Sequence, residues 1–168
     1  MTEATCLKTT LEDGILLVEL NRPEKRNALD ETLQNELLEL FTGVATDTEV
    51  RGVVLTGSGE AFSAGGDLSR FEKEWDPAEF RAQSHELSRL IGSIERLEKP
   101  VVAAIGGLAT GAGTQLALSC DLRIASENAR FLFREGMIGF IPSHGGCARL
   151  VKLVGLARAR DILLGART

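Results

Sequence analysis

Residues 99–118 read KPVVAAIGGLATGAGTQLAL, and this stretch decides the fold assignment. Residues 101–105 form a continuous apolar run after a proline, which is typical of a buried strand. Glycines at 106–107 and 111–113 then interrupt the pattern, and residues 114–118 favour a short buried helix. The stretch therefore predicts a strand, a glycine-rich loop and a helix in that order.

The same alternation of strands and helices extends to both sides of this stretch. Strands are predicted over residues 14–20, 51–56, 101–105 and 121–125. Helices are predicted over residues 30–46, 76–98, 114–118 and 147–164. Asp30 and Asp76 are expected to be N-caps, with Pro77 at the first helical position. Strands that alternate with helices predict an α/β fold, with a loose repeat like that of a spiral of ββα turns.

The bulk composition limits the classes of function. A chain of 168 residues with 43% hydrophobic residues fits one domain, residues 1–168. The net charge of -5 and pI near 5.2 argue against binding to nucleic acid or to an anionic membrane surface. The three cysteines form no CxxC pair, so neither a disulfide framework nor a metal site is expected, and Cys120 and Cys147 are expected to be buried.

The N-terminal residues lack the basic flank and apolar core of a signal peptide. No apolar run approaches the roughly 18 residues that a membrane span requires. We therefore expect a cytoplasmic protein that does not bind membranes.

Two loops bring small residues to places where the backbone must approach a neighbouring group. Residues 61–68 read AFSAGGDL and residues 109–115 read ATGAGTQ. The second loop opens a helix, whose unpaired N–H groups and dipole favour negative charge. This arrangement suits an oxyanion, although the glycines could equally serve only tight turns and close packing.

Taken in order, five stretches resemble the crotonase superfamily, which is also called the enoyl-CoA hydratase/isomerase family. They are NRPEKRNAL at 21–29, AFSAGGDL at 61–68, KPVVAAIGG at 99–107, CDLRIA at 120–125 and GFIPSHGG at 139–146. The resemblance covers essentially the whole chain. It implies the ClpP/crotonase fold, an α/β spiral of ββα units.

The resemblance also implies a site for an acyl-CoA thioester. The N–H groups of Gly66 and Ala112 would polarise the thioester carbonyl, and the shared intermediate would be an enolate. Coenzyme A would enter as part of the substrate, with no tightly bound cofactor. The residues that would form the wall for its nucleotide are Lys25, Arg26, Ala28, Ala64, Asp67 and Leu68. Two alternatives stay open, because these residues could form a solvated charged loop and Asp67 could be a structural turn residue.

The sequence departs from the family at one of two catalytic positions. Hydratases of the family use two glutamates, and here Glu135 stands at the second position while Gln115 stands at the first. A carboxamide can hold a water but cannot exchange a proton near neutral pH. Acid–base chemistry would therefore depend on Glu135, which favours double-bond isomerisation over two-base hydration. Two alternatives are that Glu135 is only a surface acid, and that the chain is a non-catalytic binding or scaffold protein that keeps the fold without a glutamate at position 115.

The position after Pro142 varies among the relatives, some of which have an aspartate there. This chain has Ser143 followed by His144, so His144 is a second catalytic candidate, as in carbon–carbon bond hydrolases of the family. Alternatively, His144 caps the following helix or contacts solvent. A serine hydrolase is not favoured, because adjacent residues seldom meet as nucleophile and base and no orienting acid is evident. His85 is expected to be a surface residue.

Members of the family usually continue past residues 163–168 into helices that cover the acyl pocket and build trimers or paired trimers. We therefore expect a core domain with unprotected apolar surface, and either self-association, into a trimer or hexamer, or marginal stability.

Overall fold

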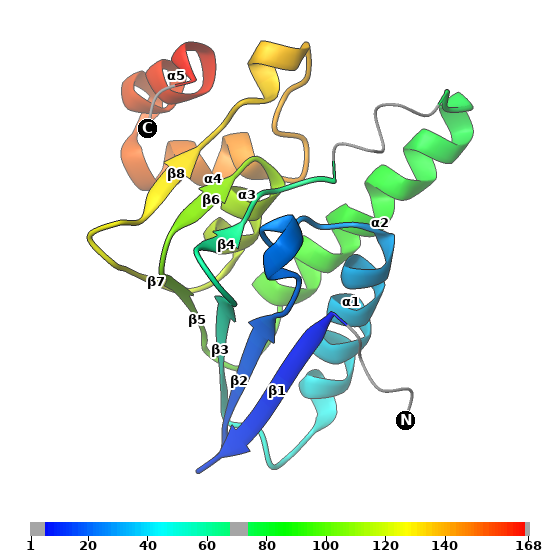
Figure 1. Ribbon diagram of the computed structural model, residues 1–168, viewed down its shortest axis with the longest axis vertical. Helices are drawn as coiled ribbons and strands as arrows, with labels where there is room; N and C mark the ends of the chain where they lie inside the picture. Colours follow the sequence, from blue (N-terminus) through cyan, green and yellow to red (C-terminus); the bar gives the residue numbers. More distant parts are fainter. Residues whose placement is uncertain (1–5, 68–73, 167–168) are drawn as a thin grey trace.

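A five-stranded sheet forms one layer of the computed structural model, which describes residues 6–67 and 74–166 (Figure 1). Its strand order is β1-β2-β3-β5-β7, in which β1 and β2 are antiparallel and all other neighbours are parallel. The parallel pairs require crossover connections, which the helices and a second sheet provide. The strands are β1 (Leu7–Glu12), β2 (Ile15–Leu20), β3 (Gly52–Gly57), β5 (Val101–Ile105) and β7 (Leu122–Ala125).

A second sheet has three parallel strands in the order β4-β6-β8. After β3, β5 and β7 the chain adds one strand to this sheet before it enters a helical segment. The structure thus confirms the predicted spiral of ββα units. The strands are β4 (Ala61–Ser63), β6 (Leu108–Thr110) and β8 (Arg130–Leu132).

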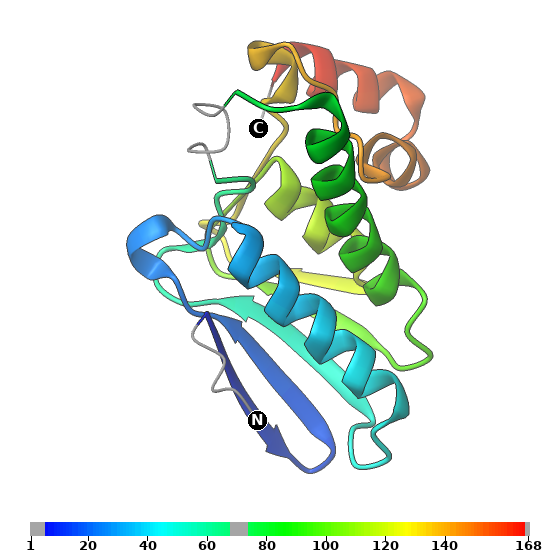
Figure 2. The ribbon, with the colours of Figure 1, turned by 90° about the vertical axis from the view of Figure 1, so that its right-hand side faces the viewer.

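Helices α1 and α2 lie side by side over one face of the larger sheet (Figure 2). Helix α3 begins just after strand β6. Asp30 accepts a hydrogen bond from the Leu33 N–H at 2.9 Å and Asp76 accepts one from the Ala78 N–H at 2.8 Å. Both predicted N-caps are confirmed. The helical segments are η1 (Pro23–Lys25), α1 (Glu31–Thr46), α2 (Pro77–Glu95), α3 (Ala112–Ser119), η3 (Glu135–Ile138), α4 (Gly146–Val154) and α5 (Leu156–Gly165).

The main core lies between the larger sheet and helices α1 to α3. Its fully buried side chains include Leu20, Leu37 and Leu90, and a smaller cluster lies beneath α4 and α5. Cys120 is buried as expected. Cys147 is only half-buried, so the prediction that it is buried is wrong. Among the described residues, no helix is long and apolar enough to cross a membrane.

Several element boundaries differ from the sequence prediction. The helix predicted over 147–164 is two helices, because Gly155 adopts a positive φ of 78° at which α4 ends. The α2 helix ends at Glu95, before the Lys99-Pro100 pair expected to stop it. Strand β1 was not predicted because only Leu7 of its six residues is buried. Strands of three residues, such as β4, are too short to give a readable periodicity.

Candidate active site

The two glycine-rich loops predicted to form the site lie against each other. A Cβ built on Gly65, whose φ is +84°, would lie 2.4 Å from the Thr110 carbonyl oxygen and 3.2 Å from the Ala112 nitrogen. A Cβ on Gly113 would lie 2.5 Å from the Ser63 carbonyl oxygen. Such distances leave no room for a methyl group, so glycine is required for the backbones to approach. The structure therefore brings together the two predicted loops.

Two backbone donors of these loops have no acceptor among the residues that the structure describes. The Leu29 N–H donates to the Gly65 carbonyl at 2.7 Å, and Leu29 forms an isolated parallel bridge with Gly66. Ala112 is the first residue of α3, where an N–H has no acceptor within the helix. Within residues 6–67 and 74–166, neither the Gly66 N–H nor the Ala112 N–H donates a hydrogen bond. Both are thus available to an external acceptor.

A buried asparagine ties the loop before α1 to strand β4. Asn27 Oδ1 accepts from the Arg22 N–H at 2.9 Å, and its Nδ2 donates to the carbonyls of Ser58 and Ala61 at 2.9 and 2.8 Å. Ser63 Oγ donates back to the Asn27 carbonyl at 2.7 Å. Sequence reasoning missed Asn27, although asparagine is one of the few residues enriched at positive φ, here +55°.

The residues predicted to form the coenzyme A wall are partly assembled by this contact. The Ala64 N–H donates to the Arg26 carbonyl at 2.8 Å, which places the two predicted segments side by side. Lys25 and Arg26 are exposed, whereas Ala28 is buried. The exposed side chains of Lys25 and Arg26 therefore belong to a segment that lies beside the loop of Gly66.

Asp67 behaves differently from the other wall residues. Its carboxylate lies 3.9 Å from Nη2 of Arg22, which also pairs with Asp30 at 2.8 Å. These contacts favour the structural alternative for Asp67, since the acid links its loop to the start of α1. Leu68 lies outside the described residues.

Gln115 and Glu135 are joined by a hydrogen bond. Gln115 Nε2 donates to Glu135 Oε1 at 3.0 Å, and Gln115 Oε1 accepts from the His144 N–H at 3.1 Å. Gln115 is 2% exposed, and a Cβ on Gly146 would lie 2.8 Å from its carboxamide. A Cβ on Gly111 would lie 3.5 Å from Glu135 Oε1, so the carboxyl group lies beside the start of α3.

The second oxygen of Glu135 has a distinct environment. Its Oε2 atom is buried and has no hydrogen-bond partner among the described residues. Burial raises the pKa of Glu135 above its ordinary value, while the hydrogen bond from Gln115 opposes that effect. A carboxyl group with a raised pKa can accept and return a proton closer to neutral pH than an ordinary glutamate can.

The imidazole of His144 points toward α2. Its Nδ1 lies 3.0 Å from Ser88 Oγ and its Nε2 lies 3.2 Å from Ser143 Oγ. The N-cap of α4 is Gly145, with no side-chain capping bond, so the alternative in which His144 caps that helix is wrong. His85 is exposed, as expected.

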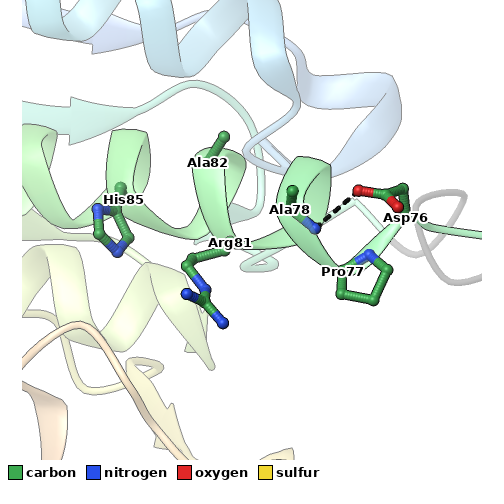
Figure 3. A pocket seen from close by; sticks show the side chains of 6 residues that line it. All are labelled: Asp76, Pro77, Ala78, Arg81, Ala82 and His85. Atoms are coloured by element: carbon green, nitrogen blue, oxygen red, sulfur yellow. Dashed lines mark hydrogen bonds between the residues drawn. The ribbon is translucent and has the colours of Figure 1, made fainter.

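A hollow of about 510 Å³ lies along the N-terminal part of α2 (Figure 3). Arg81 and His85 project to one side of the helix, whereas Ala78 and Ala82 lie on the other. Of the predicted site residues that the structure describes, none lines this hollow.

Comparisons with known proteins agree with the resemblance. The model of a family described as enoyl-CoA hydratase/isomerase matches residues 10–168. A short-chain-enoyl-CoA hydratase of Clostridium acetobutylicum is 40% identical over 157 residues, which cover 93% of this chain and 60% of that protein. A 2,3-dehydroadipyl-CoA hydratase of Escherichia coli is 37% identical over 158 residues, covering 94% and 60%. The chain thus spans about 60% of the length of these relatives.

Solved structures give the same result for the fold. An enoyl-CoA hydratase of Bacillus anthracis superposes with a TM-score of 0.92 at 33% identity, covering 97% of this chain and 64% of that one. An enoyl-CoA hydratase of Shewanella pealeana superposes with a TM-score of 0.93 at 29% identity, covering 98% and 63%.

Proposed function

This chain belongs to the enoyl-CoA hydratase/isomerase family, and we propose that it acts on acyl-CoA thioesters by stabilising a thioester enolate. The observation that carries the proposal is that the N–H groups of Gly66 and Ala112 have no acceptor in the described part of the chain, on loops that touch through Gly65. Preorganised donors of this kind typically contribute about 3 to 4 kcal/mol each to lowering a barrier, because they need no reorientation as charge develops. The two N–H groups form the proposed oxyanion hole.

Glu135 supplies the proton transfer in this proposal. Its Oε2 atom would take a proton from the α-carbon of a β,γ-enoyl thioester, which leaves a dienolate whose oxygen accepts from the two N–H groups. The same carboxyl group would return the proton to the γ-carbon, so that the double bond moves to the α,β position. One carboxylate is sufficient for this isomerisation.

Gln115 acts as a positioning residue rather than as a base. Its amide donates to Glu135 Oε1 and its oxygen accepts from the His144 N–H, so both ends of the carboxamide are engaged by the protein. The arrangement fixes one carboxylate oxygen and leaves Oε2 for the substrate. Hydration is the second candidate reaction, because relatives of 37 to 40% identity are named hydratases. It would need a base for water other than Gln115.

The carbon–carbon bond hydrolase and the non-catalytic binding protein have less support. The His144 ring is engaged by two hydroxyl groups, and its side chain forms no hydrogen bond with Glu135 within the described residues. A non-catalytic relative would have no need to bury a carboxylate oxygen that has no hydrogen-bond partner among the described residues, beside the start of α3.

A thioester panel tests the proposal. Replacing Glu135 by Gln keeps the shape but removes the exchangeable proton, and turnover should fall roughly 100- to 10,000-fold with β,γ-enoyl-CoA as substrate. Glu127→Gln is the matched control, since Glu127 is exposed and should leave turnover unchanged. An unchanged rate in Glu135→Gln would rule out the assigned role. Parallel assays with α,β-enoyl and β-keto thioesters separate isomerisation from hydration and from hydrolysis.

We further infer a cytoplasmic homo-oligomer, a trimer or hexamer. Leu122 and Ile124 on the edge strand β7 are 61% and 67% exposed, an apolar surface that association would cover. A monomeric mass by light scattering would contradict this inference.

A further inference from the structure

Ser143 and His144 form a hydrogen-bonded pair just before α4. Ser143 Oγ lies 3.2 Å from Nε2 of His144, and Nδ1 of the same ring lies 3.0 Å from Oγ of Ser88. Ser88 Oγ also donates to the Ser84 carbonyl oxygen at 2.9 Å. Because a carbonyl only accepts and a hydroxyl has one proton, Ser88 can bond the ring only as an acceptor. A neutral His144 therefore carries its proton on Nδ1 and presents the lone pair of Nε2 to Ser143.

The segment that carries this pair is fixed from two helices. Arg149 donates to the His144 carbonyl at 2.7 Å and forms an ion pair with Glu95 of α2. The His144 N–H donates to Gln115 of α3 at 3.1 Å. The backbone at His144 is thus held in place, and the pair adjoins the candidate active site through Gln115.

We propose that Ser143 is a second nucleophilic site, with His144 as its general base and Ser88 as a positioning residue. Ser143 would accept the acyl group of an acyl thioester, a substrate class that rests on the proposed function. Its side chain is exposed, which leaves it open to the acyl donor and to water. A hydroxyl hydrogen-bonded to a base that a third group orients has the arrangement of an activated nucleophile.

The chemistry needs only water as a further reactant. Ser143 Oγ attacks the carbonyl carbon while Nε2 of His144 takes the hydroxyl proton. The carbon–sulfur bond breaks, and the imidazolium gives that proton to the departing thiolate. Water then attacks the acyl-serine ester and loses a proton to Nε2, the carbon–oxygen bond breaks, and Ser143 regains the proton. The products are a carboxylic acid and a thiol.

The sequence disfavours a serine nucleophile because adjacent residues seldom meet and no orienting acid is evident, and the structure removes both objections. The adjacent residues do meet, because Nε2 of the His144 ring lies 3.2 Å from Ser143 Oγ while its Nδ1 lies 3.0 Å from Ser88 Oγ of α2. The orienting group is the Ser88 hydroxyl rather than an acid, and it lies 56 residues away in the chain.

A fluorophosphonate probe tests the nucleophile directly on the 168-residue chain. Intact mass should show one adduct, which peptide mapping should place on Ser143, and Ser143→Ala should remain unlabelled. Labelling of His144→Gln should be slower by roughly 100- to 10,000-fold, since the general base is removed. Ser126→Ala is the matched control: Ser126 is also exposed, with its hydroxyl bonded to the Gly106 carbonyl, and the variant should label at the wild-type rate.

The positioning role of Ser88 has its own readout. Ser88→Ala should slow labelling, and Ser88→Thr, which keeps the hydroxyl, should restore it. An unlabelled wild type, an adduct on another residue, or equal rates in wild type and His144→Gln would each overturn the proposal. The probe requires no enoyl-CoA turnover, so its failure leaves the Glu135 assay untouched, and failure of that assay leaves the labelling result intact.

Discussion

Replacing Gly65 by Ala should damage stability and turnover together. At a φ of +84°, an alanine costs about 1 to 2 kcal/mol, because its Cβ crowds the following carbonyl. The new Cβ would lie 2.4 Å from the Thr110 oxygen, where ordinary contact begins at 3.4 Å, so the two loops must separate by up to 1 Å. Overpacking of this kind adds about 1 to 3 kcal/mol. We therefore expect unfolding to become easier by about 2 to 5 kcal/mol.

Urea unfolding and enoyl-CoA turnover measure the two effects. A displacement near 1 Å between the Gly66 and Ala112 donors should lower turnover roughly 100-fold in the fraction that stays folded. Gly43→Ala is the control, because its Cβ on α1 meets nothing within 4 Å and should stabilise the helix by about 0.5 to 1 kcal/mol. If Gly65→Ala unfolded at the wild-type urea concentration, the close approach of the loops would be refuted.

Three further results are expected. Burial raises the pKa of Glu135 in the folded protein, so the wild type should lose stability as pH rises from the ordinary glutamate range through the raised pKa. Urea unfolding across pH should therefore show Glu135→Gln to be more stable than the wild type at neutral pH and to lose that advantage in acid. Asn27→Ala removes three hydrogen bonds, one buried and two partly buried, and should lower the unfolding free energy by about 2 to 4 kcal/mol, whereas Gln83→Ala, at an exposed contact, should cost little. Lys25→Ala should raise KM for acyl-CoA most at low salt, while KM for a thioester without phosphates stays unchanged; equal effects on both would contradict phosphate pairing.

The sequence predicted those elements whose signals are local. Asp30 and Asp76 are N-caps as expected, since capping depends on residues within one helical turn. Strand β1 escaped prediction because five of its six residues are exposed, and the helix break at Gly155 was missed because the apolar pattern continues through it. Local patterns thus locate elements with a buried face, and they miss exposed strands and breaks within a continuous apolar pattern.

The candidate site was predictable only where one segment carries the whole signal. The small residues around Gly66 and Ala112 are visible in the sequence, as is the family position of Glu135. The bonds of Asn27 to residues 31 and 34 positions away are not, because nothing near Asn27 identifies their acceptors.

The sequence by itself determined the family, the order of strands and helices, and the small-residue loops that let two backbones approach. Only the tertiary structure decided what each polar side chain does. It pairs Gln115 with Glu135 and places the His144 ring against Ser88. Among the described residues it leaves the Oε2 atom of Glu135 without a hydrogen-bond partner. The reason is physical: a residue type fixes how many hydrogen bonds a group can make, whereas distance and burial in the folded chain choose the partner.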